Sequence, residues 1–205
     1  DQGLIMPPRL APYQVVIVPI FATDAEKSGV MEAVERLRKA LMDAGLRTQV
    51  DARDNISPGF KFNEWELRGV PCRIEVGPRD VVKNAAVLAR RDRPGKAGKR
   101  VVSQEAIAQS VKDLLEDVHA SLLERATKAR DENTFEPTTY EDFKQAVSRG
   151  FARVWWAGTD DDERRVHEET KATLRCFPLQ QPEGSGVCFF TGKPASRVAI
   201  FARGY

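Results

Sequence analysis

Aromatic and charged side chains are interleaved in residues 51–80, and these residue types can bind unpaired nucleic-acid bases. Phe60, Phe62 and Trp65 follow the Ser57-Pro58 pair, which is typical of a helix start. Aromatic rings stack on bases at about 1–3 kcal/mol each, and Arg and Glu side chains read the edges of splayed-out bases. The pattern therefore predicts a binding surface. Its eleven charged residues are Asp51, Arg53, Asp54, Lys61, Glu64, Glu66, Arg68, Arg73, Glu75, Arg79 and Asp80.

Ordinary packing explains the same residues equally well. Positions 62, 65 and 69 share one face of a helix, so the rings can pack on a sheet while the charges face water. Arg73 lies on an alternating strand and Arg79 follows Gly77-Pro78. Their guanidinium groups can bind O6 and N7 of guanine or simply be solvated. Both interpretations stay open on spacing alone.

A basic loop, RRDRPGKAGKR, occupies residues 90–100 and contains the phosphate-contact candidates Lys96, Lys99 and Arg100. Such a loop either attracts phosphates with a steep salt dependence or only keeps the surface soluble. The net charge of +2 does not by itself indicate a nucleic-acid partner.

No catalytic constellation is visible. His119 and His167 lie in helical patterns without a neighbouring nucleophile, and neither a P-loop nor a GxGxxG motif occurs. Cys72, Cys176 and Cys188 have spacings that suit neither a disulfide framework nor a four-ligand metal site. We therefore expect no catalytic residue and no metal ligand.

The length of 205 residues, with 41% hydrophobic and 30% charged residues, suits one large or two small domains of a soluble protein. No apolar run approaches the roughly 20 residues of a membrane helix, and no signal-peptide pattern opens the chain. We therefore expect a cytoplasmic protein without membrane contact. Because the chain does not begin with Met, we also expect it to be a piece of a longer polypeptide.

Residues 1–132 have the pattern of an α/β domain. Thr23 and Glu26 predict a capped helix that ends at Gly45, and Ser103 is a candidate cap for a long helix that fades near Arg130. A βαβ unit with a right-handed crossover opens the domain. The expected strands are at about 13–21, 46–52, 72–76, 85–91 and 101–103, and the expected helices at about 24–44, 58–68 and 104–130.

The segment DENTFEPTT, residues 131–139, has the composition of a linker and places a domain boundary near residue 133. The expected domains are therefore 1–132 and 133–205. In the second, helices are expected at 139–151 and 159–170, and strands at about 154–158, 172–179 and 197–205.

Several segments together identify a family. LIMPPRLAPYQVVIVPI, SPGFKFNEWELRGVPCRIEVGPRD, ETKATLRCFPL, CFFTGKPA and the terminal FARGY resemble the C-terminal half of prolyl-tRNA synthetases of the archaeal and eukaryotic-like type, along essentially the whole chain. The resemblance implies a class II anticodon-binding domain, with a mixed five-stranded sheet and three helices, followed by a small zinc-binding-like α/β domain.

The resemblance also implies which residues read the guanines of the proline anticodon. Carried onto matching positions, the readers are Phe62, Glu66, Arg73 and Arg79, with Lys61 and Asp80 as weaker candidates. We expect some aromatics to pack on the sheet, while the four readers form an edge from which Arg73 points outward.

The chain departs from the zinc-containing members of this family. Ala157 and Asp162 occupy two positions where those relatives have cysteines, and Thr191 replaces the partner of Cys188. We therefore predict that the C-terminal domain folds without zinc. Its core would then be carried by Trp155, Trp156, Phe177, Phe189 and Phe190.

The resemblance implies that the full protein is a proline–tRNA ligase that uses ATP and Mg²⁺. The catalytic domain is absent from this chain, so we expect the chain alone to be inactive. The implied partners are tRNA(Pro), the protein's own N-terminal catalytic domain, towards which Tyr205 would reach, and a second copy in a homodimer. The alternatives are a free-standing RNA-binding or regulatory module and a flavodoxin-like small-molecule binder, which the missing phosphate-loop glycines disfavour.

Overall fold

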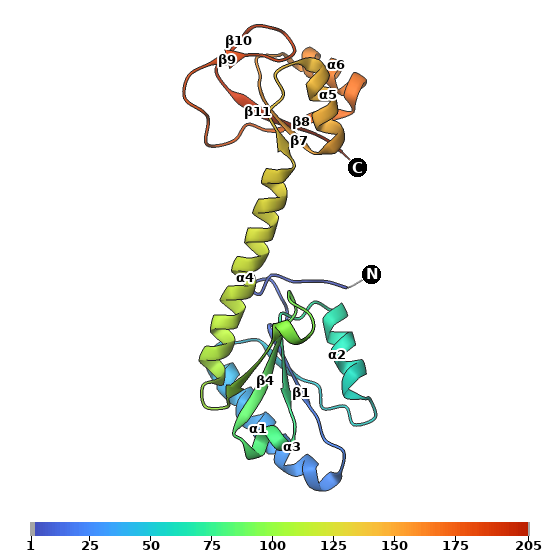
Figure 1. The fold of residues 1–205 in the computed structure, drawn as a ribbon, viewed down its shortest axis with the longest axis vertical. Coiled ribbons are helices and arrows are strands. Elements are labelled where there is room, and N and C mark those ends of the chain that lie inside the picture. The colour runs from blue at the N-terminus through green and yellow to red at the C-terminus, as the bar shows by residue number, and fades with distance from the viewer. Residues whose placement is uncertain (1–2, 205) are drawn as a thin grey trace. The chain divides into compact units, whose positions relative to one another are not determined.

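The polypeptide divides into two compact units, one up to Glu124 and a second from Arg125 onward. The computed structural model (Figure 1) describes residues 3–204. Within these residues, no helix has both the length and the apolar character needed to cross a membrane.

The first unit is built on a mixed five-stranded sheet in the order β2-β1-β3-β4-β5. β1 is parallel to β2 and β3, whereas β3 with β4 and β4 with β5 are antiparallel. The mixed five-stranded sheet that the family resemblance implied is confirmed. The strands are β1 (Val15–Pro19), β2 (Thr48–Val50), β3 (Cys72–Val76), β4 (Ala85–Arg90) and β5 (Lys99–Ser103).

Two helices of this unit, α1 and α2, begin where local sequence signals place them. The Thr23 hydroxyl accepts a hydrogen bond from the Glu26 N–H at the start of α1, and Ser57 caps α2 with Pro58 in the first turn. Both predicted starts are confirmed. The helices are α1 (Asp24–Asp43), α2 (Pro58–Leu67), α3 (Pro78–Val82) and α4 (Ile107–Glu132), and a 3₁₀ turn, η1, spans Lys96–Gly98.

Two local predictions were wrong, and one helix was not predicted. Ser103 ends β5 and accepts a hydrogen bond from Glu105 N–H, so it does not cap α4, which begins at Ile107. The short helix α3 was not predicted, because Gly77-Pro78 was noted only as the pair that precedes Arg79. The expected linker at 131–139 contains the end of α4 and the strand β6 (Thr134–Phe135), which pairs with β7.

The sheet is covered on both faces (Figure 1). α1 and α4 pack on one face, against the side chains of residues such as Ile17, Ile74 and Leu88. α2 packs on the other face, where Trp65 contacts the β1 residues Val16 and Val18. Every residue of β3 is buried as a result, including the charged ones.

The second unit has a four-stranded sheet in the order β6-β7-β11-β8, in which β11 is antiparallel to both β7 and β8. Phe143 and Phe201 are its largest fully buried side chains, and neither was predicted. Of the five predicted core aromatics, Trp156 is buried and the other four are half-buried against the same cluster. The remaining elements are α5 (Tyr140–Arg149), β7 (Phe151–Trp155), α6 (Asp160–Thr170), β8 (Ala172–Cys176), β9 (Gly186–Val187), β10 (Pro194–Ala195) and β11 (Val198–Arg203).

Candidate nucleic-acid interface

Strand register brings residues of β3, β4 and β5 into one row on the α2 face of the sheet. Arg73 pairs with Ala89, and Ala89 pairs with Lys99. Val16, the β1 partner of Arg73, packs against Trp65 of α2, which identifies the face. Since residues two apart on a strand share a face, Glu75 joins the same row of side chains.

Five side chains from α2, β3 and β5 meet here, and we call them the Phe62 cluster: Phe62, Glu66, Arg73, Glu75 and Lys99. The Arg73 guanidinium carbon lies 4.1 Å from the centroid of the Phe62 ring, and Lys99 Nζ lies 5.6 Å from it. Arg73 Nη1 donates to Glu66 Oε1 at 2.6 Å, and its Nη2 donates to Glu75 Oε1 at 3.0 Å. Lys99 Nζ lies 2.8 Å from Glu75 Oε1.

The expectation that Arg73 points outward is wrong, because only 8% of the residue is exposed. β3 lies between β1 and β4, so its side chains on this face are covered by α2 and by side chains of the neighbouring strands. Two carboxylates neutralise the guanidinium, and the ring of Phe62 lies beside it. An isolated buried charge is costly, but one that is paired and hydrogen-bonded is tolerated. Phe62 itself is half-buried.

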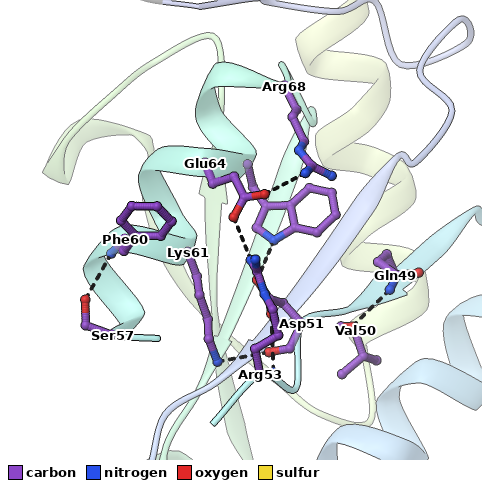
Figure 2. A network of polar contacts seen from close by, with 10 residues as sticks. Gln49, Val50, Asp51, Arg53, Ser57, Phe60, Lys61, Glu64 and Arg68 are labelled. Atoms are coloured by element: carbon purple, nitrogen blue, oxygen red, sulfur yellow. Dashed lines mark hydrogen bonds and ion pairs between the residues drawn. The ribbon is translucent and has the colours of Figure 1, made fainter. Parts of the chain in front are cut away.

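Lys61 belongs to a different group of contacts, shown in Figure 2. Only 3% of Lys61 is exposed, and its Nζ donates to the Asp51 carbonyl oxygen at 3.2 Å. The Asp51 carboxylate accepts hydrogen bonds from Arg53 and from Trp65 Nε1. These contacts attach α2 to the chain that follows β2.

Burial and ion pairing shift the pKa values of Asp51 and Lys61 in this group. The Arg53 guanidinium, opposed by desolvation and helped by the Trp65 N–H, lowers the pKa of Asp51 to about 2. Desolvation lowers the pKa of Lys61, against the attraction of Asp51. Asp51 is therefore a firmly ionised anchor for α2.

Arg79 and Asp80 lie on α3, directly after β3. Arg79 is exposed, whereas Asp80 Oδ2 accepts a hydrogen bond from the Gly77 N–H at 2.8 Å and closes the first turn. Among the residues that the structure describes, neither has a hydrogen bond or ion pair with a member of the Phe62 cluster. The six nominated anticodon residues are therefore divided: three come together, one anchors α2, and two lie on α3.

The three phosphate-contact candidates of the basic loop have different surroundings. Lys96 is exposed in η1. Lys99 belongs to the Phe62 cluster, and Arg100 Nη2 donates to the Ser110 carbonyl oxygen of α4. The loop is thus not a uniform basic surface.

Glu75 is the residue of the cluster that sequence reasoning missed. It was noted only as one charge on an alternating strand. The signal that could have found it is its spacing of two from Arg73, which places both side chains on one face of β3.

The positions that correspond to zinc ligands do not form a ligand set. The Asp162 carboxylate accepts a hydrogen bond from the Thr159 N–H and caps α6. Burial raises the pKa of the Cys188 thiol, but hydrogen bonds from Thr191, Ala157 and Phe190 outweigh it and lower the pKa. No group of three or more His, Cys, Asp or Glu side chains could hold a metal within the described residues. These donors do not fit a tetrahedral zinc ion, which takes four Cys or His ligands.

Comparison with known proteins matches both units. Residues 14–122 match the family model described as "Anticodon binding domain", and residues 140–205 match "Prolyl-tRNA synthetase, C-terminal". The chain is 54% identical over its whole length to a proline–tRNA ligase of Roseiflexus castenholzii and 53% identical to one of Chloroflexus aggregans, and it covers 42% of each. It is also 49% identical to the chloroplastic/mitochondrial proline–tRNA ligase of Arabidopsis thaliana, of which it covers 38%. The chain thus spans about two fifths of the length of these relatives.

Proposed function

Because the chain belongs to the prolyl-tRNA synthetase family, as its anticodon-binding and C-terminal region, we propose that it recognises tRNA(Pro) for a protein that attaches proline to that tRNA with ATP and Mg²⁺. The observation that carries the proposal is the Phe62 cluster, in which an aromatic ring, a guanidinium group and a half-exposed carboxylate lie together. This is the chemistry that binds unpaired guanines.

Three members of the cluster, Phe62, Arg73 and Glu66, contact the RNA base in this proposal. The Phe62 ring stacks on a base, and Arg73 donates to guanine O6 or N7. The Glu66 carboxylate accepts hydrogen bonds from guanine N1–H and N2–H₂, the donors on its Watson–Crick edge. The Glu66–Arg73 bond of the free protein, at 2.6 Å, exchanges for these contacts when RNA binds.

The other nominated residues contribute differently. Arg79 offers an exposed cation near the carboxyl end of β3, and Lys96 offers one in η1. Lys61 and Asp80 reach RNA only if their bonds to Asp51 and Gly77 open. Arg100 would have to leave the Ser110 carbonyl oxygen in the same way.

The organisation of the whole protein is part of the proposal. We place the anticodon-binding domain at 1–132 and the C-terminal domain, without zinc, at 133–205. The adenylate-forming domain and the contacts of a homodimer would belong to the remainder of the longer relatives, so this chain alone would form no prolyl-adenylate. The proposed location is the cytoplasm. Tyr205, expected to reach towards the catalytic domain, lies outside the described residues.

The test is a binding titration with tRNA(Pro) and with an anticodon mutant of the same tRNA. Arg73→Ala should weaken binding of tRNA(Pro) by about 1–3 kcal/mol, the scale of a lost bidentate base contact, and relax discrimination at one anticodon position. Because Arg73 is buried between two carboxylates, Arg73→Lys serves as a second variant that keeps the charge and loses the fork. Equal losses for all tRNAs in both variants would show that Arg73 contacts only the phosphate backbone.

A further inference from the structure

We propose that Glu75 is a positioning residue, which holds Arg73 and Lys99 in their places beside Phe62 so that an anticodon base meets them already arranged. The inference rests on the proposed function of the same site. It assigns a role to a carboxylate that has the wrong charge to attract RNA.

The contacts of Glu75 join two strands that are not neighbours. Arg73 donates to Glu75 Oε1 from Nε at 3.2 Å and from Nη2 at 3.0 Å. Lys99 Nζ donates to Glu75 Oε2 at 2.9 Å. β4 lies between β3 and β5, and the residue in the intervening position is the small, buried Ala89. A larger residue there would obstruct the path of the long side chains over the sheet.

The two carboxylates of the cluster differ in a way that separates their roles. The Glu75 side chain is 10% exposed and is bound by two cations, whereas the Glu66 side chain is 42% exposed and pairs with Arg73. Glu66 can therefore exchange its partner for a base with little rearrangement. Glu75 remains in place.

The geometry of Arg73 shows what this anchoring achieves. Glu75 takes Nε–H and one N–H of Nη2, so the guanidinium plane is fixed and its Nη1 edge faces Glu66. Arginine and lysine side chains lose much rotamer freedom when a ligand immobilises them. Side chains that are already held lose less on binding, which favours the correct base.

The two possible roles of Glu75, repulsion of phosphates by its charge and positioning of Arg73 and Lys99, predict opposite effects for Glu75→Gln. A neutralised carboxylate removes a repulsion of phosphates, so on charge alone the variant should bind every RNA more tightly. If Glu75 positions Arg73 and Lys99, the variant should instead bind the cognate anticodon more weakly, while binding of a non-cognate anticodon is unchanged or tighter.

The experiment uses the 205-residue chain and two RNA stem-loops, one with the two guanines of a proline anticodon and one with adenines in their places. For Glu75→Gln we expect about a tenfold loss of affinity for the guanine loop and no loss for the adenine loop. Glu64→Gln is the matched control, because it makes the same charge change on α2 at a carboxylate that also pairs with two cations, Arg53 and Arg68 (Figure 2). It should keep the discrimination of the unmodified chain.

Three outcomes would overturn the inference. Glu75→Gln could bind the guanine loop as tightly as before or more tightly, or it could lose affinity equally for both loops. If thermal unfolding shows that this variant does not fold, Lys99→Met is the second variant, because it removes one partner of Glu75 at a side chain that is 37% exposed. Full discrimination by Lys99→Met would then overturn the inference. If the unmodified chain fails to distinguish the two loops, the proposed function falls first and the role of Glu75 falls with it.

Discussion

Arg73 and Asp51 are buried charged residues that contact two different edges of helix α2. Arg73 is placed between Glu66 and Glu75 and beside the Phe62 ring. Asp51 is bound by Arg53 and by the Trp65 indole N–H. Both charges are therefore paired within the protein. Each has one partner whose side chain is about two fifths exposed, Glu66 (42%) for Arg73 and Arg53 (40%) for Asp51.

The lowered pKa of Asp51 predicts how the free energy of unfolding depends on pH. A carboxyl group with a folded-state pKa of about 2 and an ordinary value of 3.8 stabilises the folded protein above about pH 4, and this contribution is lost as pH falls through the folded pKa. We expect a contribution of about 2 kcal/mol to the free energy of unfolding, lost between about pH 5 and pH 2.

The measurement is denaturant unfolding of the chain and of Asp51→Asn over that pH range. The variant should have a lower free energy of unfolding at neutral pH and a shallower fall in acid. Asp43→Asn, which removes an exposed ion pair with Lys39, is the control and should leave the slope nearly unchanged. Identical slopes in all three proteins would contradict the assigned role of Asp51.

At the scale of elements, two neighbouring edges of helix α2 make different contacts. Lys61, Glu64, Trp65 and Arg68 follow helical spacing and face the Asp51 contacts of Figure 2. Phe62 and Glu66, four residues apart, form the neighbouring edge and contact Arg73. One edge attaches the helix to the sheet, and the other presents the candidate binding residues.

The connection between β4 and β5 determines where Lys99 enters the sheet, so a change in this connection should affect both stability and binding. A Cβ atom on Gly98 would lie 1.7 Å from the Arg93 carbonyl oxygen, which is backbone and cannot move aside alone. We expect Gly98→Ala to lower the free energy of unfolding by about 1–3 kcal/mol and to weaken binding of the guanine stem-loop.

Gly95→Ala is a useful comparison in the same connection, because a Cβ there meets no atom within 4 Å, although its φ of +78° is unfavourable for alanine. Its cost should come from backbone strain alone, without the clash at Arg93. A Gly98→Ala protein as stable as the unmodified chain would show that the connection is looser in solution than in the structure.

At the scale of the whole molecule, the second unit has a core rich in aromatic side chains. Phe189 lies 4.3 Å from Phe143 and 5.8 Å from Phe201, measured between ring centroids, and Trp156 packs against both Phe189 and Phe201. Aromatic pairs of this kind add stability beyond the area they bury. These aromatic contacts support the prediction that the unit folds without zinc.

We predict that elemental analysis of the purified chain finds substoichiometric zinc. A chelator should leave the thermal unfolding midpoint unchanged, because a structural zinc contributes its binding free energy to folding and its removal would lower that midpoint. One tightly held zinc ion per chain would refute the prediction.

The sequence by itself was enough to place two helix starts and the first strand and to identify the family. Thr23 and Ser57 predicted helix starts through their side-chain caps, the run of β-branched residues within 13–21 predicted β1, and the aromatic and charged residues around Phe62 predicted a binding surface. Each of these signals is formed by residues close together along the chain, so the local sequence pattern is enough to detect it.

Only the tertiary structure decided the partners of the charged residues. Arg73 was expected to face outward, but strand pairing places it between an α2 carboxylate and Glu75, and brings in Lys99 from 24 residues beyond Glu75. Sheet order and register set these contacts, and neither is encoded in the spacing of residues along one strand. The sequence therefore named most of the candidate site, and the fold decided which of those residues stand together and what holds them there.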